Sequence, residues 1–471
     1  MNEEDFKKIQ DILESKELDR LVIPHWLDYR NGDYTHQGKA IDAWFENQSK
    51  GILAIATGGG KTLTSLAAAS LLTEKVETLL VVVAVPTVAL MNQWCEEISL
   101  FGIEAINTNV LSKKSKIRAL KQACSNLKFK VVKNSVIVIT HESLKSDFID
   151  EVKNRSKGIA TLLIADEVHN LGSRGFMIKA PDFFDYKIGL SATPIRKYDD
   201  EGTSFLLQYF NDVVYEFSLE EAIGKCLVNF DYHINLVHLN AEEEDEFYDL
   251  TQKIKRLSYA AEYGKDTDEY KKLSGLWIKR RRIIETAINK LKIFSDSFPV
   301  DREQAQNSLI FCSDKAPEQL NEINKILKQR NINFHQVTSS ETANPKLLKS
   351  IVNEYNLGNL QVLTSKRVLD EGFNVPQTKT AYILASNTTS KQWTQRLGRV
   401  LRKANDKEFA VIYDYIVLPI NFDSDFDPEF ENLVKNETER LLFFLKYARN
   451  GTEKGGAIEV LDRVIEIINH Q

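Results

Sequence analysis

ILAIATGGGKTLTSLAAASLL, residues 52–72, joins a short apolar run to a glycine-rich turn and then to a helical stretch. Consecutive glycines let the backbone curl, so that successive N–H groups point at phosphate oxygens. The helix that begins after the turn adds the positive end of its dipole. The segment therefore predicts a phosphate-binding turn after a buried strand, with an ordinary tight strand–helix turn as the alternative.

The residues of this turn predict binding of ATP together with a magnesium ion. The Lys61 ammonium would reach the β- and γ-phosphates, and the Thr62 hydroxyl would take a place in the Mg²⁺ shell. Ile55 stands where the strict P-loop pattern has glycine. The residues expected to bind the nucleotide here are Thr57, Gly58, Gly59, Gly60, Lys61 and Thr62, and Thr62 is also an expected metal ligand.

A second motif, TLLIADEVHN (161–170), places two adjacent carboxylates at the exit of another apolar run. Buried carboxylates are costly unless they bind something. Asp166 is expected to hold Mg²⁺ through water, and Glu167 to orient and deprotonate the attacking water. A pair of acids that only caps a helix is the alternative for this motif taken singly. The two motifs in this order favour ATP hydrolysis.

Short apolar runs alternate with helical stretches along most of the chain. Strands that are apolar on both faces are typical of parallel sheets with helices on each side. Two series of such runs occur, at 52–56, 79–85, 135–140, 161–165 and 187–192, and then at 309–312, 334–338, 361–365, 380–385 and 410–416. We therefore expect an α/β fold with two parallel-sheet domains.

The pattern between and after the two series is helical. Residues 241–295 are charged and lack strand-like runs, which predicts a helical hairpin, and 229–239 could be a strand that already belongs to the second sheet. The expected division is an N-terminal helical extension (1–33), an ATP-binding domain (34–225), a connecting strand and helical hairpin (226–300), a second domain (301–428) and a helical tail (429–471).

Composition restricts the class of protein. The formal net charge of −6 argues against a basic nucleic-acid coat but is compatible with a local basic track. Four scattered cysteines without a CxxC pair indicate neither a disulfide framework nor a zinc site. The charged N-terminus lacks the apolar core of a signal peptide, and no apolar run approaches the roughly 20 residues that span a bilayer. We expect a cytoplasmic protein that does not enter a membrane.

Seven ordered segments resemble the motifs of the superfamily 2 helicases, from about residue 34 to about residue 403. The resemblance implies two RecA-like domains that hydrolyse ATP and act on nucleic acid. The matching segments are HQGKAIDAWF (36–45), VVVAVPTVALMNQW (81–94), DEVH (166–169), SATP (191–194), NSLIFCSD (307–314), LTSKRVLDEGFNVP (363–376) and QRLGRVLR (395–402), in addition to the P-loop.

The resemblance also assigns roles to matching residues. Arg399 and Arg402 would be arginine fingers that reach the γ-phosphate, with a surface basic cluster as the alternative, and Gln395 joins them among the expected catalytic residues. Gln37 would read adenine, and Asn374, where the family usually has Asp, would contact the ribose. The residues implied to couple the ATP site to the nucleic acid are His169, Ser191, Ala192 and Thr193.

The variant motifs favour DNA over RNA as the substrate. DEVH, and glutamine at the start of QRLGRVLR, differ from the DEAD-box RNA helicases and are similar to the branch with XPB-like helicases and the motor subunits of type I and III restriction enzymes. We expect an ATP-dependent DNA helicase or double-strand DNA translocase. A motor subunit of a larger restriction, repair or phage-defence complex, with partner proteins and little unwinding alone, and an RNA helicase are the alternatives.

Candidate nucleic-acid contacts come from the same resemblance and from charge. Two basic stretches, 113–133 and 278–292, are additional candidates, although a charged run on a helix is usually a solvated face. Trp393 is interpreted as a core or domain-interface residue more readily than as a base-stacking one. The residues implied to contact the nucleic-acid backbone are Thr87, Gln93, Thr140, Ser365 and Arg367.

Overall fold

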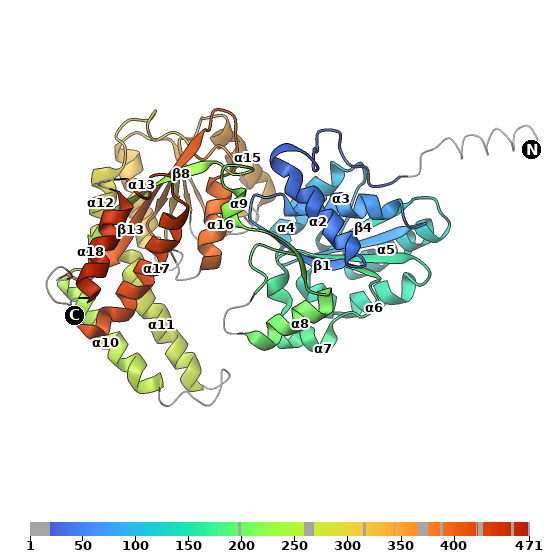
Figure 1. Cartoon of the computed structure of the whole chain (residues 1–471), viewed down its shortest axis with the longest axis horizontal. Helices are drawn as coiled ribbons and strands as arrows, with labels where there is room; N and C mark the ends of the chain where they lie inside the picture. The colour runs from blue at the N-terminus through green and yellow to red at the C-terminus, as the bar shows by residue number, and fades with distance from the viewer. Residues whose placement is uncertain are drawn as a thin grey trace, which may run out of the picture. The chain divides into compact units, whose positions relative to one another are not determined.

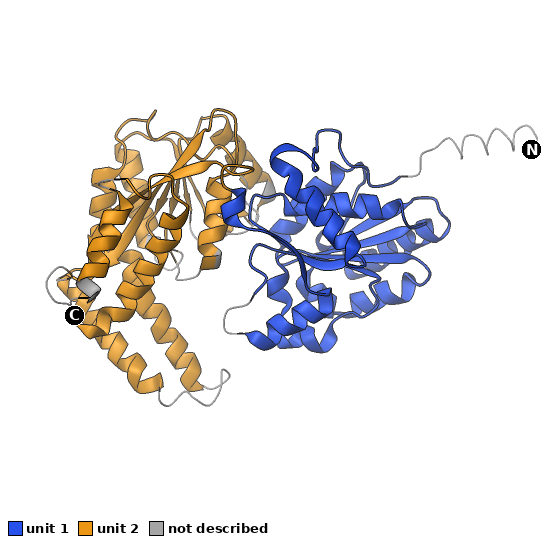
Figure 2. Cartoon of the chain, in the orientation of Figure 1, with its two compact units in different colours: residues 1–222 blue, residues 223–471 orange. Residues whose placement is uncertain are grey.

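The computed structural model describes residues 19–195, 199–258, 268–313, 317–342, 344–365, 375–386, 390–420, 422, 427–453 and 456–469. The chain divides into two compact units, Met1–Ala222 and Ile223–Gln471 (Figure 2). We call them unit 1 and unit 2 and describe each by itself.

Unit 1 is built on a seven-stranded sheet in which every neighbouring pair is parallel. The strand order is β3-β4-β2-β5-β6-β1-β7. The interior strand β2 is buried along its whole length, as its unbroken apolar sequence requires. The strands are β1 (Lys50–Ile55), β2 (Leu79–Val85), β3 (Ile106–Asn107), β4 (Asn134–Thr140), β5 (Ala160–Ala165), β6 (Tyr186–Ser191) and β7 (Val213–Phe217).

Helices connect the parallel strands of unit 1, so all the loops that follow strands lie at one edge of the sheet (Figure 1). Residues 19–31 contain no helix, and the remainder of the helical extension expected over 1–33 lies largely outside the described residues. The helices are α2 (Thr35–Glu46), α3 (Lys61–Thr73), α4 (Val88–Ser99), α5 (Lys113–Lys128), α6 (Asp147–Arg155), α7 (Arg174–Lys179), α8 (Asp200–Phe210) and α9 (Leu219–Ala222), with short 3₁₀ turns at Gly32–Tyr34, Thr108–Val110, His141–Lys145 and Val168–Leu171.

Unit 2 contains a second parallel sheet, with strand order β10-β11-β9-β12-β13-β8. Strand β8 pairs with β13 over ten residues in register, so the run at 229–239 does belong to this sheet. The strands are β8 (Asn229–His238), β9 (Ser308–Phe311), β10 (Phe334–Val337), β11 (Val362–Ser365), β12 (Thr380–Ile383) and β13 (Phe409–Leu418). The expected α/β fold of two parallel-sheet domains is confirmed.

The helices of unit 2 include a long hairpin, α10 (Ala241–Ser258) and α11 (Asp268–Thr286), which follows β8 and packs along its own length (Figure 1). The remaining helices are α12 (Asn289–Ser297), α13 (Pro317–Gln329), α14 (Ser339–Thr342), α15 (Pro345–Asn356), α16 (Ser390–Val400), a 3₁₀ turn at Pro428–Phe430, α17 (Glu431–Tyr447) and α18 (Ala457–Asn469). None of the helices in the described ranges has the length and apolar character that a membrane span requires.

A buried charge network fastens α17 to the sheet of unit 2. The Arg440 guanidinium lies 3.1 Å from Asp414 and 2.8 Å from Glu437, and Tyr232 donates its hydroxyl to Asp414 at 2.9 Å. All four side chains are buried. Because removing one partner of such a pair leaves an uncompensated buried charge, the network fixes α17 on the sheet of unit 2.

Candidate nucleotide site

The glycine-rich turn lies between the end of β1 and the start of α3, at the carboxyl edge of the sheet of unit 1. Gly58 and Gly60 have φ angles of +88° and +84°, which L side chains rarely adopt. A Cβ atom on Gly59 would lie 2.7 Å from Ile55 Cγ2, and one on Gly60 would collide with the Gln37 amide nitrogen. The turn therefore requires glycine, both for its backbone angles and because no side chain would fit. Ile55 packs directly beside the turn.

Two polar atoms beside the turn are buried and have no hydrogen-bond partner in the described part of the chain. They are Gln37 Oε1 and Thr57 Oγ1. The Gln37 amide nitrogen donates to the Gly59 carbonyl at 3.3 Å, and Lys61 Nζ donates to the Ile55 carbonyl at 3.2 Å. Since buried polar groups are nearly always paired, the unpaired oxygens and the glycine cradle fit a polar ligand such as a nucleotide.

Asp166 and Glu167 follow β5 on the same edge of the sheet. Asp166 is 7% exposed; its Oδ2 accepts from Trp94 Nε1 and its Oδ1 from the Glu167 N–H, both at 2.9 Å. Burial, and next the charge of Glu167, raise the pKa of Asp166 to about 6. A bound cation would offset this cost of ionisation, so the carboxyl suits the metal ligation expected of it.

Strand β6 ends at Ser191, which lies beside His169, two residues after this acid pair. His169 Nδ1 lies 2.9 Å from Ser191 Oγ and 3.4 Å from Glu167 Oε2. The Thr193 N–H donates to the same Ser191 hydroxyl at 3.1 Å, across the intervening Ala192. The structure thus joins the segments DEVH and SATP through two side chains, as a coupling role would require.

Three side chains that sequence reasoning had not singled out hold this edge together. Trp94 donates to Asp166 from α4, and His141 Nε2 lies 2.9 Å from the Asp166 carbonyl. Burial lowers the pKa of His141 to about 4, so the neutral ring donates this hydrogen bond. His36 stacks on Phe217 with centroids 3.8 Å apart and bonds the Gly59 carbonyl at 2.7 Å. Only His36 could have been singled out from the sequence, because it directly precedes Gln37.

The expected nucleic-acid contacts of unit 1 lie at the same carboxyl edge. Thr87 caps α4 by accepting from the Leu90 N–H, and Thr140, at the end of β4, lies 3.1 Å from the Ser143 hydroxyl. Gln93 donates to Glu97 at 2.8 Å along α4. These positions are compatible with backbone contacts, and their role stays a prediction.

In unit 2 the helix α16 carries Gln395 and Arg399, and Arg402 follows it. Gln395 is buried, whereas Arg399 and Arg402 are partly exposed. Trp393 is 4% exposed and donates to the Ser386 hydroxyl at 3.0 Å, so it is a core residue and is not a platform for bases.

Four other predicted sites belong to unit 2. Ser365 ends β11 and is buried. Arg367 and Asn374 lie outside the described residues. Within the basic stretch 278–292, Lys290 is 1% exposed and donates to the carbonyls of Ile284 and Leu384, so it cannot contact nucleic acid; this corrects the prediction at that residue.

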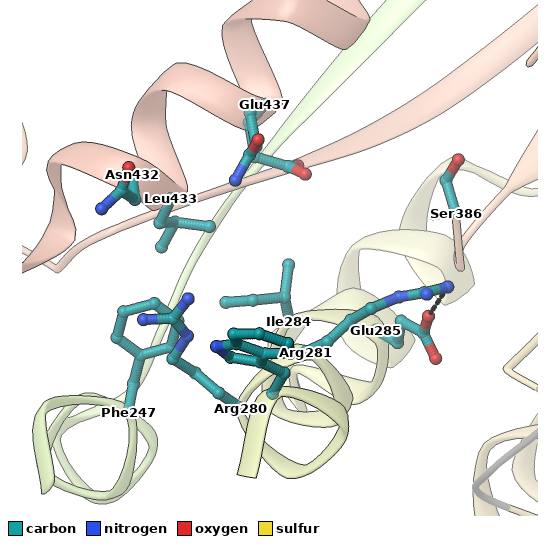
Figure 3. A pocket seen from close by; sticks show the side chains of 11 residues that line it. Phe247, Arg280, Arg281, Ile284, Glu285, Ser386, Asn432, Leu433 and Glu437 are labelled. Atoms are coloured by element: carbon teal, nitrogen blue, oxygen red, sulfur yellow. Dashed lines mark ion pairs between the residues drawn. The ribbon is translucent and has the colours of Figure 1, made fainter. Parts of the chain in front are cut away.

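A cavity of about 200 Å³ lies at the base of the α10–α11 hairpin, facing α17 (Figure 3). Arg281 reaches across one side of it and pairs with Glu285 at 2.5 Å. Two arginines and two glutamates line it, so it carries no net charge that would select an ionic ligand. The lining residues are Phe247, Trp277, Arg280, Arg281, Ile284, Glu285, Ser386, Asn432, Leu433, Asn436 and Glu437.

Two segments of the chain match known protein families. Residues 32–196 match the family described as type III restriction enzyme, res subunit, and residues 289–404 match the helicase conserved C-terminal domain. The chain is 28% identical over 394 residues to the DNA 3'-5' translocase XPB2 of Sulfurisphaera tokodaii, covering 80% of each protein.

Two solved structures share the fold at low sequence identity. The DNA-bound, ATP-dependent type ISP restriction-modification enzyme LlaBIII superimposes with a TM-score of 0.59 at 16% identity, over 90% of this chain and 30% of that one. The helicase domain of Pyrococcus furiosus Hef gives 0.54 at 15% identity, over 84% and 97%. The solved structures support the fold, and the two family matches and the XPB2 relative, together with the ordered motifs, show that the chain belongs to the superfamily 2 helicases, in the branch of XPB-like and restriction-enzyme-like motors.

Proposed function

We propose that this protein is an ATP- and Mg²⁺-dependent DNA translocase or helicase. The observation that carries the proposal is the carboxyl edge of unit 1, where a glycine cradle, two unpaired buried oxygens and the Asp166–Glu167 pair meet. Lys61 and the turn would bind the phosphates, and Thr62 and Asp166 would hold the metal ion. A bound Mg²⁺ supplies charge neutralisation at the phosphates.

The roles of the chain's own groups follow from their surroundings. Glu167 would accept the proton of the attacking water, and His169 fixes its position from 3.4 Å. Arg399 and Arg402 on unit 2 would stabilise charge that develops in the transition state. Because they belong to a different unit from the glycine turn, hydrolysis would depend on how the two units close on the nucleotide.

DNA is the proposed substrate, with 3′-to-5′ movement. Support comes from the XPB2 relative, whose name specifies a DNA 3'-5' translocase. The motor of a larger restriction, repair or defence complex is the second candidate, because residues 32–196 match the family of a restriction-enzyme subunit. An RNA helicase is the third.

The test is ATP turnover without nucleic acid and with single-stranded DNA, duplex DNA and RNA at matched salt, since phosphate-backbone affinity falls steeply with salt. We expect stimulation by DNA and not by RNA, and Lys61→Ala should abolish turnover while the circular dichroism spectrum is unchanged. Undiminished turnover in Lys61→Ala would refute the assignment. Stimulation by RNA alone would favour the third candidate, and no stimulation would favour a complex in which a partner gates the motor.

A further inference from the structure

One buried ammonium group holds the C-terminal end of α16. Lys407 Nζ donates to the backbone carbonyls of Val400, of Arg402 at 2.9 Å and of Pro376 at 3.0 Å. The Lys407 side chain is 6% exposed. Three carbonyl acceptors match the three donors of one ammonium group, so a single side chain ties the end of the helix to the segment that precedes β12.

The surroundings of Lys407 are unfavourable to its charge. Its acceptors within the described residues are all carbonyl oxygens, and the charged groups that act on it, Arg402 and Lys379, are cations. Burial in the first place, and then these cations, lower the pKa of Lys407 to about 7. An apolar side chain would fill the space at less cost, so packing alone does not account for a lysine here.

A second set of backbone contacts holds the same residues. Immediately after unit 2 begins, the Val228 N–H donates to the Leu401 carbonyl at 2.8 Å, and Leu227 forms an antiparallel bridge with Arg402. The backbone around Arg402 is therefore fixed by Lys407 and by the segment 223–228 together. The backbone of Arg402 cannot move without breaking one of these contacts.

We propose that Lys407 is a positioning residue for Arg402 and sets the place of its guanidinium for ATP hydrolysis. The inference rests on the proposed function, in which Arg402 stabilises transition-state charge. A displacement of about 1 Å at a catalytic group can cost about 10²-fold in rate. Lys407 acts through the backbone of its neighbour and makes no contact with ATP itself.

The first experiment compares Lys407→Met with Lys290→Met. Both substitutions delete a buried ammonium that donates to backbone carbonyls of unit 2, so a general effect on folding appears in both. We expect Lys407→Met to lower kcat for DNA-stimulated ATP hydrolysis by about 10- to 100-fold with a nearly unchanged KM for ATP. Lys290→Met should keep the wild-type kcat. Equal kcat in the two variants would overturn the proposal.

The second experiment is a double-substitution cycle with Arg402→Ala. If Lys407 acts through Arg402, the double variant turns over ATP no more slowly than Arg402→Ala alone. Losses that multiply would show that Lys407 acts independently and would overturn the inference. Wild-type turnover in Arg402→Ala would instead refute the role proposed for Arg402 itself, which separates the two failures.

A milder substitution keeps the test open should Lys407→Met unfold. Lys407→Gln retains two N–H donors in place of three. We expect its kcat to lie between those of the wild type and Lys407→Met, with a folded circular dichroism spectrum. Wild-type kcat in a folded Lys407→Gln whose backbone amides at residues 400–402 exchange faster than those of the wild type would show that the contact is dispensable and would overturn the proposal.

Discussion

Replacing Trp94 with phenylalanine isolates one hydrogen bond at the candidate metal site. The indole of Trp94 is 1% exposed and its N–H donates to Asp166 Oδ2 at 2.9 Å. Phenylalanine keeps most of the apolar ring and removes the donor. Asp166 then retains the Glu167 N–H on its other oxygen, but loses the group that favours its ionised form from α4.

A matched control lies in the same unit. Trp44 is fully buried and its indole N–H donates, also at 2.9 Å, to the backbone carbonyl of Lys187. Trp44→Phe therefore removes the same donor and the same ring atoms, but from a neutral acceptor. The difference between the two variants reports the charge on Asp166 and cancels the loss of ring area.

The magnitude follows from the type of acceptor. A hydrogen bond to a charged group contributes about 1.5–3 kcal/mol, and one between neutral groups about 0.5–1.5 kcal/mol. At a pH where Asp166 is ionised, we expect Trp94→Phe to lower the free energy of unfolding of unit 1 by about 1 kcal/mol more than Trp44→Phe does. Below pH 6 the difference should shrink, because the pKa of Asp166 is raised to about 6 and its carboxyl becomes neutral.

Two assays measure this prediction. Unfolding in urea, monitored by hydrogen exchange of the β5 and β2 amides, measures the stability of unit 1 alone. A local probe is needed because a chain of two units does not unfold in one step. Binding of Mn²⁺ in place of Mg²⁺, followed by electron paramagnetic resonance, reports the site; it should weaken in Trp94→Phe and stay unchanged in Trp44→Phe. Equal unfolding free energies and equal Mn²⁺ affinities would refute the idea that Trp94 supports the charge of Asp166.

Two further predictions concern the glycine turn and a buried lysine. Gly60→Ala should abolish ATP binding in a nucleotide-fluorescence titration, because its Cβ would collide with the Gln37 amide. Gly158 has a similar left-handed φ but open space around it, so Gly158→Ala should lose only about 1–2 kcal/mol of stability. Equal ATP affinity in the two variants would contradict this prediction. Burial lowers the pKa of Lys290 to about 8 from the ordinary 10.5. Between these two pH values the unfolded chain therefore binds more protons at Lys290 than the folded chain does. The free energy of unfolding consequently rises with pH, by at most about 3 kcal/mol. The difference in unfolding free energy between wild type and Lys290→Met should change by about 2 kcal/mol from pH 8 to pH 10, because the rest of the change falls outside this pH range. A flat difference would contradict the prediction.

Much of the fold could be predicted because buried parallel strands have a local signature. LLVVVAV at 79–85 coincides with β2, and the other runs fall within a residue or two of their strands. Strand β7 was not predicted as a strand. It lies at the edge of its sheet and four of its five residues are partly or fully exposed, so its sequence, VVYEF, lacks the continuous apolar run.

The residues of the candidate site likewise differ in whether the local sequence marks them. Lys61, Asp166 and Glu167 can be recognised in the sequence because each comes shortly after a strand, in a motif whose other residues are neighbours in sequence. Trp94 lies 72 residues from Asp166, and Lys407 acts on carbonyls brought to it by the fold. Nothing local in the sequence marks an indole or an ammonium whose partner is chosen by tertiary contact, so these residues required the structure.

The position of these supporting side chains would give the proposed stimulation by nucleic acid a physical route within unit 1. The helix that begins after Thr87 carries Trp94, which holds the Asp166 carboxylate, and Thr140 directly precedes His141, which holds the Asp166 carbonyl. Both loops expected to contact the nucleic-acid backbone are thus one side chain away from the same acid. A shift in either loop must move Asp166 or break a hydrogen bond to it, so nucleic acid bound there would bias the geometry of hydrolysis. It follows that Trp94→Phe should lower the ratio of DNA-stimulated to basal turnover, and a ratio equal to that of Trp44→Phe would exclude α4 as the route.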